Sequence, residues 1–147
     1  MATPEEAKEI ARRFIDEVFN KRNLKHAEEV LSEGFTEHSP PFPGMGNDKA
    51  SAIEGFRLLL DSSDDLRVEI VDLVSDGGRI AIRGRYSGTD TGGSAPGVPP
   101  TGKRFDIEGI DVAVLGDDGR FVEHYGIADV MTAMGQLGLM PGPGDQG

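Results

Sequence analysis

The chain has 147 residues, of which 37% are hydrophobic, and it carries a formal net charge of −11 at pH 7 and no cysteine. This composition is typical of one globular domain and excludes a disordered or fibrous chain, a disulfide scaffold and a cysteine-ligated metal site. The acidic charge disfavours partners such as nucleic acid or an anionic membrane. No apolar run approaches the ~18 residues of a membrane span, and the acidic start does not resemble a signal peptide, so we expect a cytoplasmic protein.

Three helices are predicted in the first half. Thr3, Pro4 and Glu6 have the spacing of a capping box with proline at the first helical position, and apolar residues at helical spacing then continue to about Phe19. A short second helix is expected from Leu24 to Leu31. A third helix follows Asn47 or Asp48, one of which is its cap, and buries a face that includes Ile53, Phe56, Leu59 and Leu60.

Strands dominate the second half, where the apolar period changes to two at Leu66. Turn signals at 76–78 and 117–119 separate the predicted strands 66–70, 79–86, 105–115 and 121–128, and a short extended piece is expected at 35–38. A short helix follows from Val130. Helices first and adjacent antiparallel strands last predict an α+β fold whose curved antiparallel sheet leaves a hollow for a small ligand. We expect one domain over residues 1–140 and a frayed tail at 141–147.

The segment Gly97–Arg104 nearly matches a phosphate-binding loop. However, no hydroxyl residue follows Lys103, two prolines remove backbone donors, and a strand follows where such a loop needs a helix. We therefore reject nucleotide binding. The wider segment Ser87–Lys103 is long for a hairpin connection, so we expect either a mobile excursion or a lid over a pocket.

The three histidines do not have the spacing of metal ligands, and we expect no metal. His26 falls among charged residues and is expected to be solvated. His38 precedes a proline-rich loop, and His124 lies inside the last strand. These two residues either line one pocket as hydrogen-bonding groups or are separate buried histidines that backbone groups satisfy.

The direction of side chains in the last strand follows from alternation. If the strand is regular, Tyr125 and Asp129 face the hollow together, and His124 reaches it only if a bulge changes its direction. Asp129 also stands where a helix starting at Val130 needs an N-cap. Asp111 is a carboxylate in a strand interior, which is unusual, so it either faces solvent or lines the hollow, where Arg83 or Arg85 could pair with it.

Four segments resemble, in the same order, the SnoaL-like polyketide cyclases, also called ester cyclases, of the superfamily that holds nuclear transport factor 2 and ketosteroid isomerase. They are 13–20, 35–38, the loop 87–103, and the last strand 118–125 with Asp129 and Gln136–Gly138. The resemblance implies a cone-shaped α+β barrel in which N-terminal helices wrap a curved sheet around an internal pocket, and a homodimer or tetramer. Asp90 and Tyr125 replace a histidine and a tryptophan that are usual in the family, which leaves the substrate open.

The resemblance also implies that Asp129 is the catalytic aspartate. The leading hypothesis is an enzyme that closes a ring in a polyketide-like keto ester by intramolecular aldol addition, without a cofactor. A carboxylate whose pKa is raised by burial would form the enolate, and His38, His124 or Tyr125 would hold the developing oxyanion. The expected substrate-binding residues are Phe14, Val18, Phe56, Arg85, Asp111 and Tyr125.

Two other functions are compatible with the sequence. One is a non-catalytic protein that binds an apolar small molecule and in which Asp129 only caps a helix. The other is isomerisation, hydration or hydroxylation in the same pocket. In each case the expected partners are a small hydrophobic or polycyclic ligand and a second copy of the chain.

Overall fold

The computed structural model describes residues 1–140, which form a mixed sheet packed against helices. Helix α1 (Pro4–Phe14) continues into the π-helix η1 (Ile15–Asn20) and is followed by α2 (Leu24–Val30), β1 (Leu31–Glu37) and α3 (Lys49–Ser62). Strands β2 (Arg67–Ser75), β3 (Arg79–Thr89), β4 (Arg104–Leu115) and β5 (Phe121–Ala128) come next, and α4 (Val130–Gln136) is last. The expected frayed tail lies outside the described residues.

The helix starts confirm the capping signals. The Thr3 hydroxyl accepts a hydrogen bond from the Glu6 amide, and the Glu6 carboxylate accepts one from the Thr3 amide, so both halves of the capping box are present. Asp48, and not Asn47, caps α3 by accepting from the Ser51 amide. The first helical segment continues beyond Phe19 to Asn20, but its hydrogen bonding changes to the π pattern at Ile15.

The sheet has the order β1-β5-β4-β3-β2, and its neighbours are antiparallel except for β1, which is parallel to β5. The expected sheet of four antiparallel strands was therefore incomplete. The predicted second helix is confirmed to within one residue, because α2 ends at Val30 with Leu31 as its C-cap. The extended piece expected at 35–38 begins earlier, since β1 starts at Leu31 directly after α2. No turn residue separates these two elements, so the sequence contains no signal that marks this boundary.

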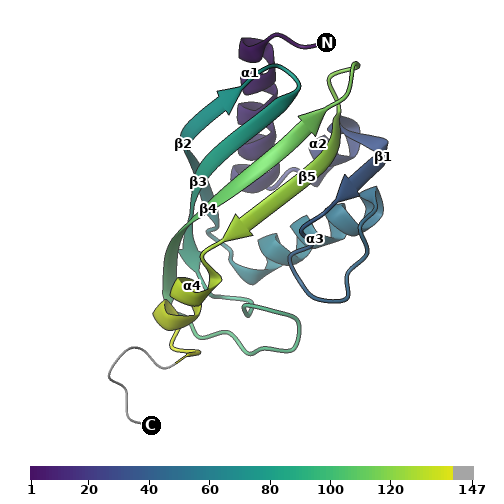
Figure 1. Cartoon of the computed structure of the whole chain (residues 1–147). Coiled ribbons are helices and arrows are strands. Elements are labelled where there is room, and N and C mark those ends of the chain that lie inside the picture. Colours follow the sequence, from purple (N-terminus) through teal and green to yellow (C-terminus); the bar gives the residue numbers. More distant parts are fainter. Residues whose placement is uncertain (141–147) are drawn as a thin grey trace.

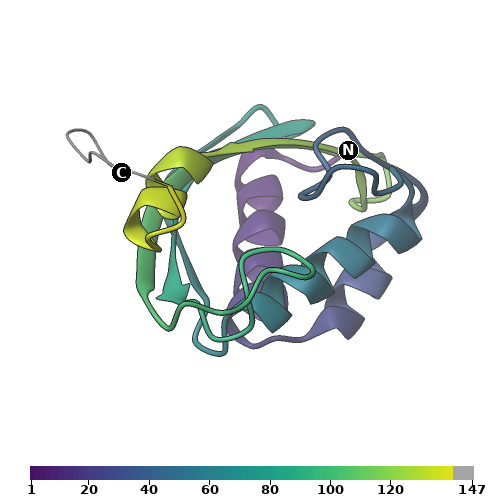
Figure 2. The ribbon, with the colours of Figure 1, turned by 90° about the horizontal axis from the view of Figure 1, so that it is seen from below.

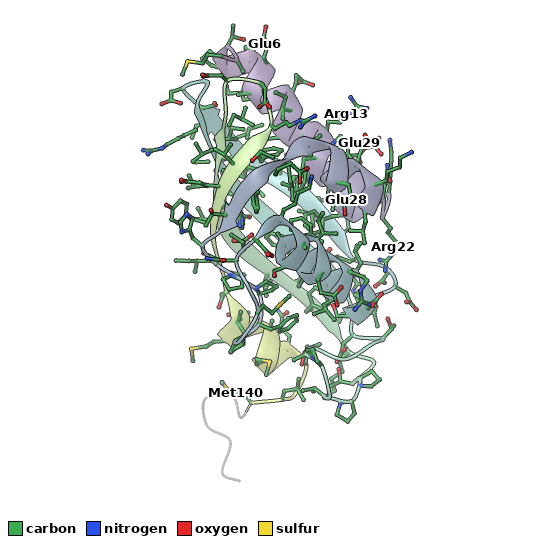
Figure 3. The ribbon with its side chains drawn as sticks, turned by 90° about the vertical axis from the view of Figure 1, so that its right-hand side faces the viewer. Glu6, Arg13, Arg22, Glu28, Glu29 and Met140 are labelled. Carbon is green, nitrogen blue, oxygen red and sulfur yellow. The ribbon has the colours of Figure 1, made fainter. Side chains whose placement is uncertain are left out.

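The helices α1 to α3 lie on one side of the sheet (Figure 1). Seen from below, the sheet curves around that side, with α4 on the left of the view and α3 at the lower right (Figure 2). Charged side chains such as Arg13, Glu28 and Glu29 point away from the sheet (Figure 3) and are exposed. None of the helices within residues 1–140 is long and apolar enough to cross a membrane.

An aromatic cluster fills the space between helices and sheet. The centroid of the Phe14 ring lies 5.2 Å from that of Phe121 and 5.7 Å from that of Phe56. Both pairs have the edge-to-face arrangement that aromatic rings prefer. Val18 is fully buried in the same core. The expected solvated position of His26 was wrong, because this side chain is 6% exposed and its ring lies 6.3 Å from Phe14.

The connection between β3 and β4 is anchored at its base. Strand β3 continues to Thr89, so the connection begins at Asp90, which is 2% exposed. The Asp90 carboxylate accepts hydrogen bonds from the amides of Gly93 and Thr101 and from the Thr101 hydroxyl, each at 2.9 Å. The connection then passes over the end of α3, where a cavity of about 100 Å³ separates it from Phe42 and Leu58. A gating role for this connection stays a prediction.

Candidate active site

Four polar side chains form one hydrogen-bonded series on the inner face of the sheet, the face that the helices cover. The hydroxyl group of Tyr86 on β3 donates a hydrogen bond to the carboxylate of Asp111 on β4. The other oxygen of Asp111 lies 2.8 Å from Nε2 of His124 on β5. The opposite ring nitrogen, Nδ1 of His124, lies 2.7 and 2.9 Å from the two carboxylate oxygens of Glu37, at the end of β1. Four strands thus contribute one residue each.

A bulge in β5 gives His124 its inward direction. Leu115 pairs with Phe121 and Val114 pairs with Glu123, so Val122 is an extra residue between them. Phe121 is buried against the helices, and His124 faces the same side one position later than simple alternation, which would place residue 123 there. Tyr125 is turned to the outer face and is 43% exposed. The regular-strand prediction for Tyr125 was therefore wrong, and the bulge alternative for His124 is confirmed.

Glycines provide the room for this series. Gly84 pairs with Gly109 and Gly126 pairs with Asp111 across the neighbouring strands. A Cβ atom at Gly109 would lie 2.9 Å from Cε2 of Tyr86, and one at Gly126 would lie 2.5 Å from Oδ1 of Asp111. Both distances are shorter than van der Waals contact. The absence of side chains at these positions lets the Tyr86 ring lie along the sheet and reach Asp111.

Charge balance within the series follows from its donors and acceptors. An ionised carboxylate only accepts hydrogen bonds, so two ionised carboxylates, one at each ring nitrogen, require a doubly protonated imidazolium at His124. Burial by itself would lower the pKa of His124, but the hydrogen bonds to Asp111 and Glu37 outweigh it and raise the pKa to about 9. Burial and the neighbouring Asp111 raise the pKa of Tyr86, so the phenol keeps its proton and serves as a donor.

The glycine at position 126 allows a direct test of this packing. We expect Gly126→Ala to lower the free energy of unfolding by about 1–3 kcal/mol, because the new methyl group overlaps the carboxylate of Asp111. Gly135→Ala in α4 is the control, since a Cβ there meets no atom within 4 Å. Urea denaturation of both variants measures the difference, and equal stability of the two would contradict the crowding argument.

Several predicted site residues lie away from the series. Asp129 is exposed and caps α4, because its carboxylate accepts hydrogen bonds from the amide and the hydroxyl of Thr132, the latter at 2.7 Å. The predicted cap is thus confirmed, and the catalytic role of Asp129 stays a prediction. His38 lies on the outer face, where its ring stacks on Tyr125 at 4.1 Å. The alternative in which His38 and His124 line one pocket together is therefore wrong.

The arginines do not pair with Asp111. Arg85 lies on the exposed outer face and binds Asp106 through two hydrogen bonds of 2.7 Å. Arg83 binds Asp72 and Glu108. Side chains on opposite faces of one sheet cannot meet, and alternation along β3 and β4 places these arginines on the face opposite Asp111. Arg85 is thus outside the series to which Asp111 belongs.

Two members of the series, Tyr86 and Glu37, were missed. Tyr86 has the same parity as the apolar residues Ile80 and Ile82 of its strand, and this alternation could have placed it inside. Glu37 has the parity of Phe35, but its partner is 87 residues away in β5, and no local pattern indicates that pairing. Among residues 1–140, no group of three histidine, aspartate or glutamate side chains has an arrangement that could hold a metal ion.

The fold is thus α+β, with a curved sheet whose helix-covered face carries the carboxylate–imidazole series. A family model for SnoaL-like polyketide cyclases matches residues 9–137. The chain therefore belongs to the SnoaL-like polyketide cyclase family, and it has the fold of nuclear transport factor 2-like proteins. No curated protein matches the sequence.

Solved structures give the same result for the fold. The putative polyketide cyclase IdmH from Streptomyces antibioticus is 26% identical, with a TM-score of 0.77, and the match covers 90% of this chain and 99% of IdmH. TsrD from Streptomyces laurentii is 24% identical, with a TM-score of 0.77 and coverage of 90% and 94%. AclR from Streptomyces galilaeus, a putative hydroxylase, is 21% identical, with a TM-score of 0.82 and coverage of 95% and 89%.

Proposed function

We propose that this protein closes a ring in a polyketide-like keto ester by intramolecular aldol addition, with a carboxylate as general base and no cofactor. The observation that carries the proposal is the hydrogen-bonded series on the inner face, in which a carboxylate, an imidazolium and a phenol meet beside an apolar core. Membership of the SnoaL-like family supports the reaction class. Phe14 and Phe56, which are only partly buried, would contact the apolar part of the substrate. Val18 was expected to do the same, but it is fully buried in the core and exposes no surface to a ligand.

Asp111 is the base that the geometry supports best. It faces the interior with 21% of its side chain exposed, and the His124 cation lies 2.8 Å from it. It would take the proton from the carbon between the two carbonyl groups. The resulting enolate carbon then attacks a further carbonyl carbon elsewhere in the same molecule, which closes the ring. The new alkoxide takes a proton from Tyr86. The proton held by Asp111 passes to Tyr86 through their hydrogen bond, which restores both groups.

Asp129 is the second candidate for the base. The family resemblance favours it, and its exposed carboxylate is accessible to a ligand. It follows Gly126, the cross-strand partner of Asp111, by three residues, which corresponds to roughly 10 Å along a strand. Its hydrogen bonds to Thr132 hold it at the start of α4. The two aspartates thus occupy different places, and variants can separate their roles.

The proposed function is tested by proton exchange at the activated methylene of model keto esters in D2O, followed by NMR. The protein is expected to accelerate exchange above the buffer rate for at least one ester of a panel that includes polycyclic members. No acceleration with any ester would favour the non-catalytic binder. A ring-closed product from a tethered keto ester would separate aldol addition from simple isomerisation.

We also propose that the protein is a homodimer that pairs through the outer face of β4 and β5. Ile110 and Ile127 are cross-strand partners there and are 57% and 82% exposed, and Tyr125 lies beside them. Exposed apolar groups that lie together typically mark an interface.

Sedimentation is expected to give a mass of two 15.7 kDa chains at micromolar concentration. Ile127→Asp is expected to give the monomer, because a charge would be buried in the interface. Val71→Asp on the edge strand β2 serves as the control and is expected to stay dimeric. A monomeric unmodified protein would contradict the proposal.

A further inference from the structure

Glu37 is a buried carboxylate to which the proposed reaction assigns no step. Its side chain is 4% exposed, at the end of the parallel strand β1. The backbone around it is tied to β5, since the His38 amide donates to the His124 carbonyl at 2.9 Å and the Gly126 amide donates to the Ser39 hydroxyl at 3.0 Å. These bonds fix the end of β1 against the strand that carries His124.

The contacts of Glu37 are directed at one partner. Both of its oxygens lie within 2.9 Å of Nδ1 of His124, and one of them also accepts from the Ser39 amide at 2.9 Å. Nε2 of the same ring is bound to Asp111. Glu37 and Asp111 therefore lie on opposite edges of the ring, and His124 is the hydrogen-bonding partner that the two carboxylates share.

A buried anion without a partner is costly, so Glu37 and His124 stabilise each other as charges. The proton on Nδ1 of His124 is donated in a hydrogen bond to Glu37, so the hydrogen bond to Asp111 requires a second proton on Nε2. A neutral residue at position 37 would remove the need for two protons. His124 would then titrate nearer to the ordinary histidine value.

We infer that Glu37 is a positioning residue that fixes the orientation of the His124 ring and keeps both of its nitrogens protonated, and thereby sets the charge that faces Asp111. This inference deepens the proposed function and rests on it for its catalytic meaning. Its effect on His124 is measurable without any substrate.

The test is an NMR titration of the His124 ring in the unmodified protein and in Glu37→Gln. The amide keeps the size of the side chain and an acceptor oxygen but removes the charge. The midpoint of His124 is expected to fall by about one unit or more in Glu37→Gln, the effect of losing one close opposite charge. Glu123→Gln is the matched control, because Glu123 precedes His124 but is 43% exposed on the outer face. It should leave the midpoint unchanged.

A folded Glu37→Gln protein with the midpoint of the unmodified protein would overturn the inference. A second measurement needs no variant: the 15N shifts of both ring nitrogens at pH 7.5 should be those of protonated nitrogens, and one unprotonated nitrogen would also overturn it. If the unmodified protein exchanges no keto ester, the proposed function fails, while these ring measurements still decide the role of Glu37. Where exchange is observed, its high-pH limit should move down in Glu37→Gln together with the His124 midpoint.

Discussion

Asp111→Asn is expected to slow proton exchange on a keto ester substrate by about 10²- to 10⁴-fold, the usual contribution of a positioned general base. Asparagine keeps the shape of the side chain and an oxygen that accepts the Tyr86 hydroxyl, but it cannot take up the proton. Asp106→Asn is the matched control, because Asp106 lies on the same strand with its side chain on the exposed outer face, paired with Arg85. This control is expected to exchange at the unmodified rate, and circular dichroism verifies that each variant is folded.

The same assay separates the two candidate aspartates. Asparagine caps a helix about as well as aspartate, so Asp129→Asn should keep α4 intact and, if Asp111 is the base, should keep activity. Asp129→Ala is expected to lose about 1 kcal/mol of stability with the cap. Loss of exchange in Asp129→Asn together with normal exchange in Asp111→Asn would reverse the assignment and make Asp129 the base.

The second large effect is on stability as a function of pH. The folded protein raises the pKa of His124 from 6.5 to about 9, through Asp111 and Glu37 and against the effect of burial. The folded state holds this proton more tightly than the unfolded state does. The protonated His124 ring therefore adds to the free energy of unfolding fully below about pH 6.5, and this addition is lost as pH rises through about 9. The size of the pKa shift corresponds to about 3 kcal/mol of the free energy of unfolding.

Urea denaturation at pH 6 and pH 9.5 measures this loss. His124→Gln removes the titrating group and keeps the other ionisable residues, so it is the reference. The difference in free energy of unfolding between the unmodified protein and this variant is expected to shrink by about 3 kcal/mol between the two pH values. A difference that stays constant across the range would show that His124 does not carry the shifted proton equilibrium.

The sequence by itself determined the elements that local chemistry specifies. The capping box at Thr3 and Glu6 fixed the start of α1, and the alternation and turn signals gave strand β5 its bounds, 121–128. The N-cap role of Asp129 also followed from its place before Val130. Each of these features depends on residues within a few positions of one another, so spacing alone is informative. The segments that resemble the SnoaL-like cyclases predicted the family, which the family model confirms.

The tertiary structure decided which polar residues meet. The bulge at Val122 turned His124 inward and Tyr125 outward, and it depends on how β5 pairs with β4. The parallel pairing of β1 with β5 brought Glu37 to His124 across 87 residues of sequence. A shift of one residue in a strand exchanges its two faces, so a site built from four strands depends on every register among them. The pairing of β1 with β5 joins residues 87 positions apart, and no local pattern in the sequence records a pairing over that distance.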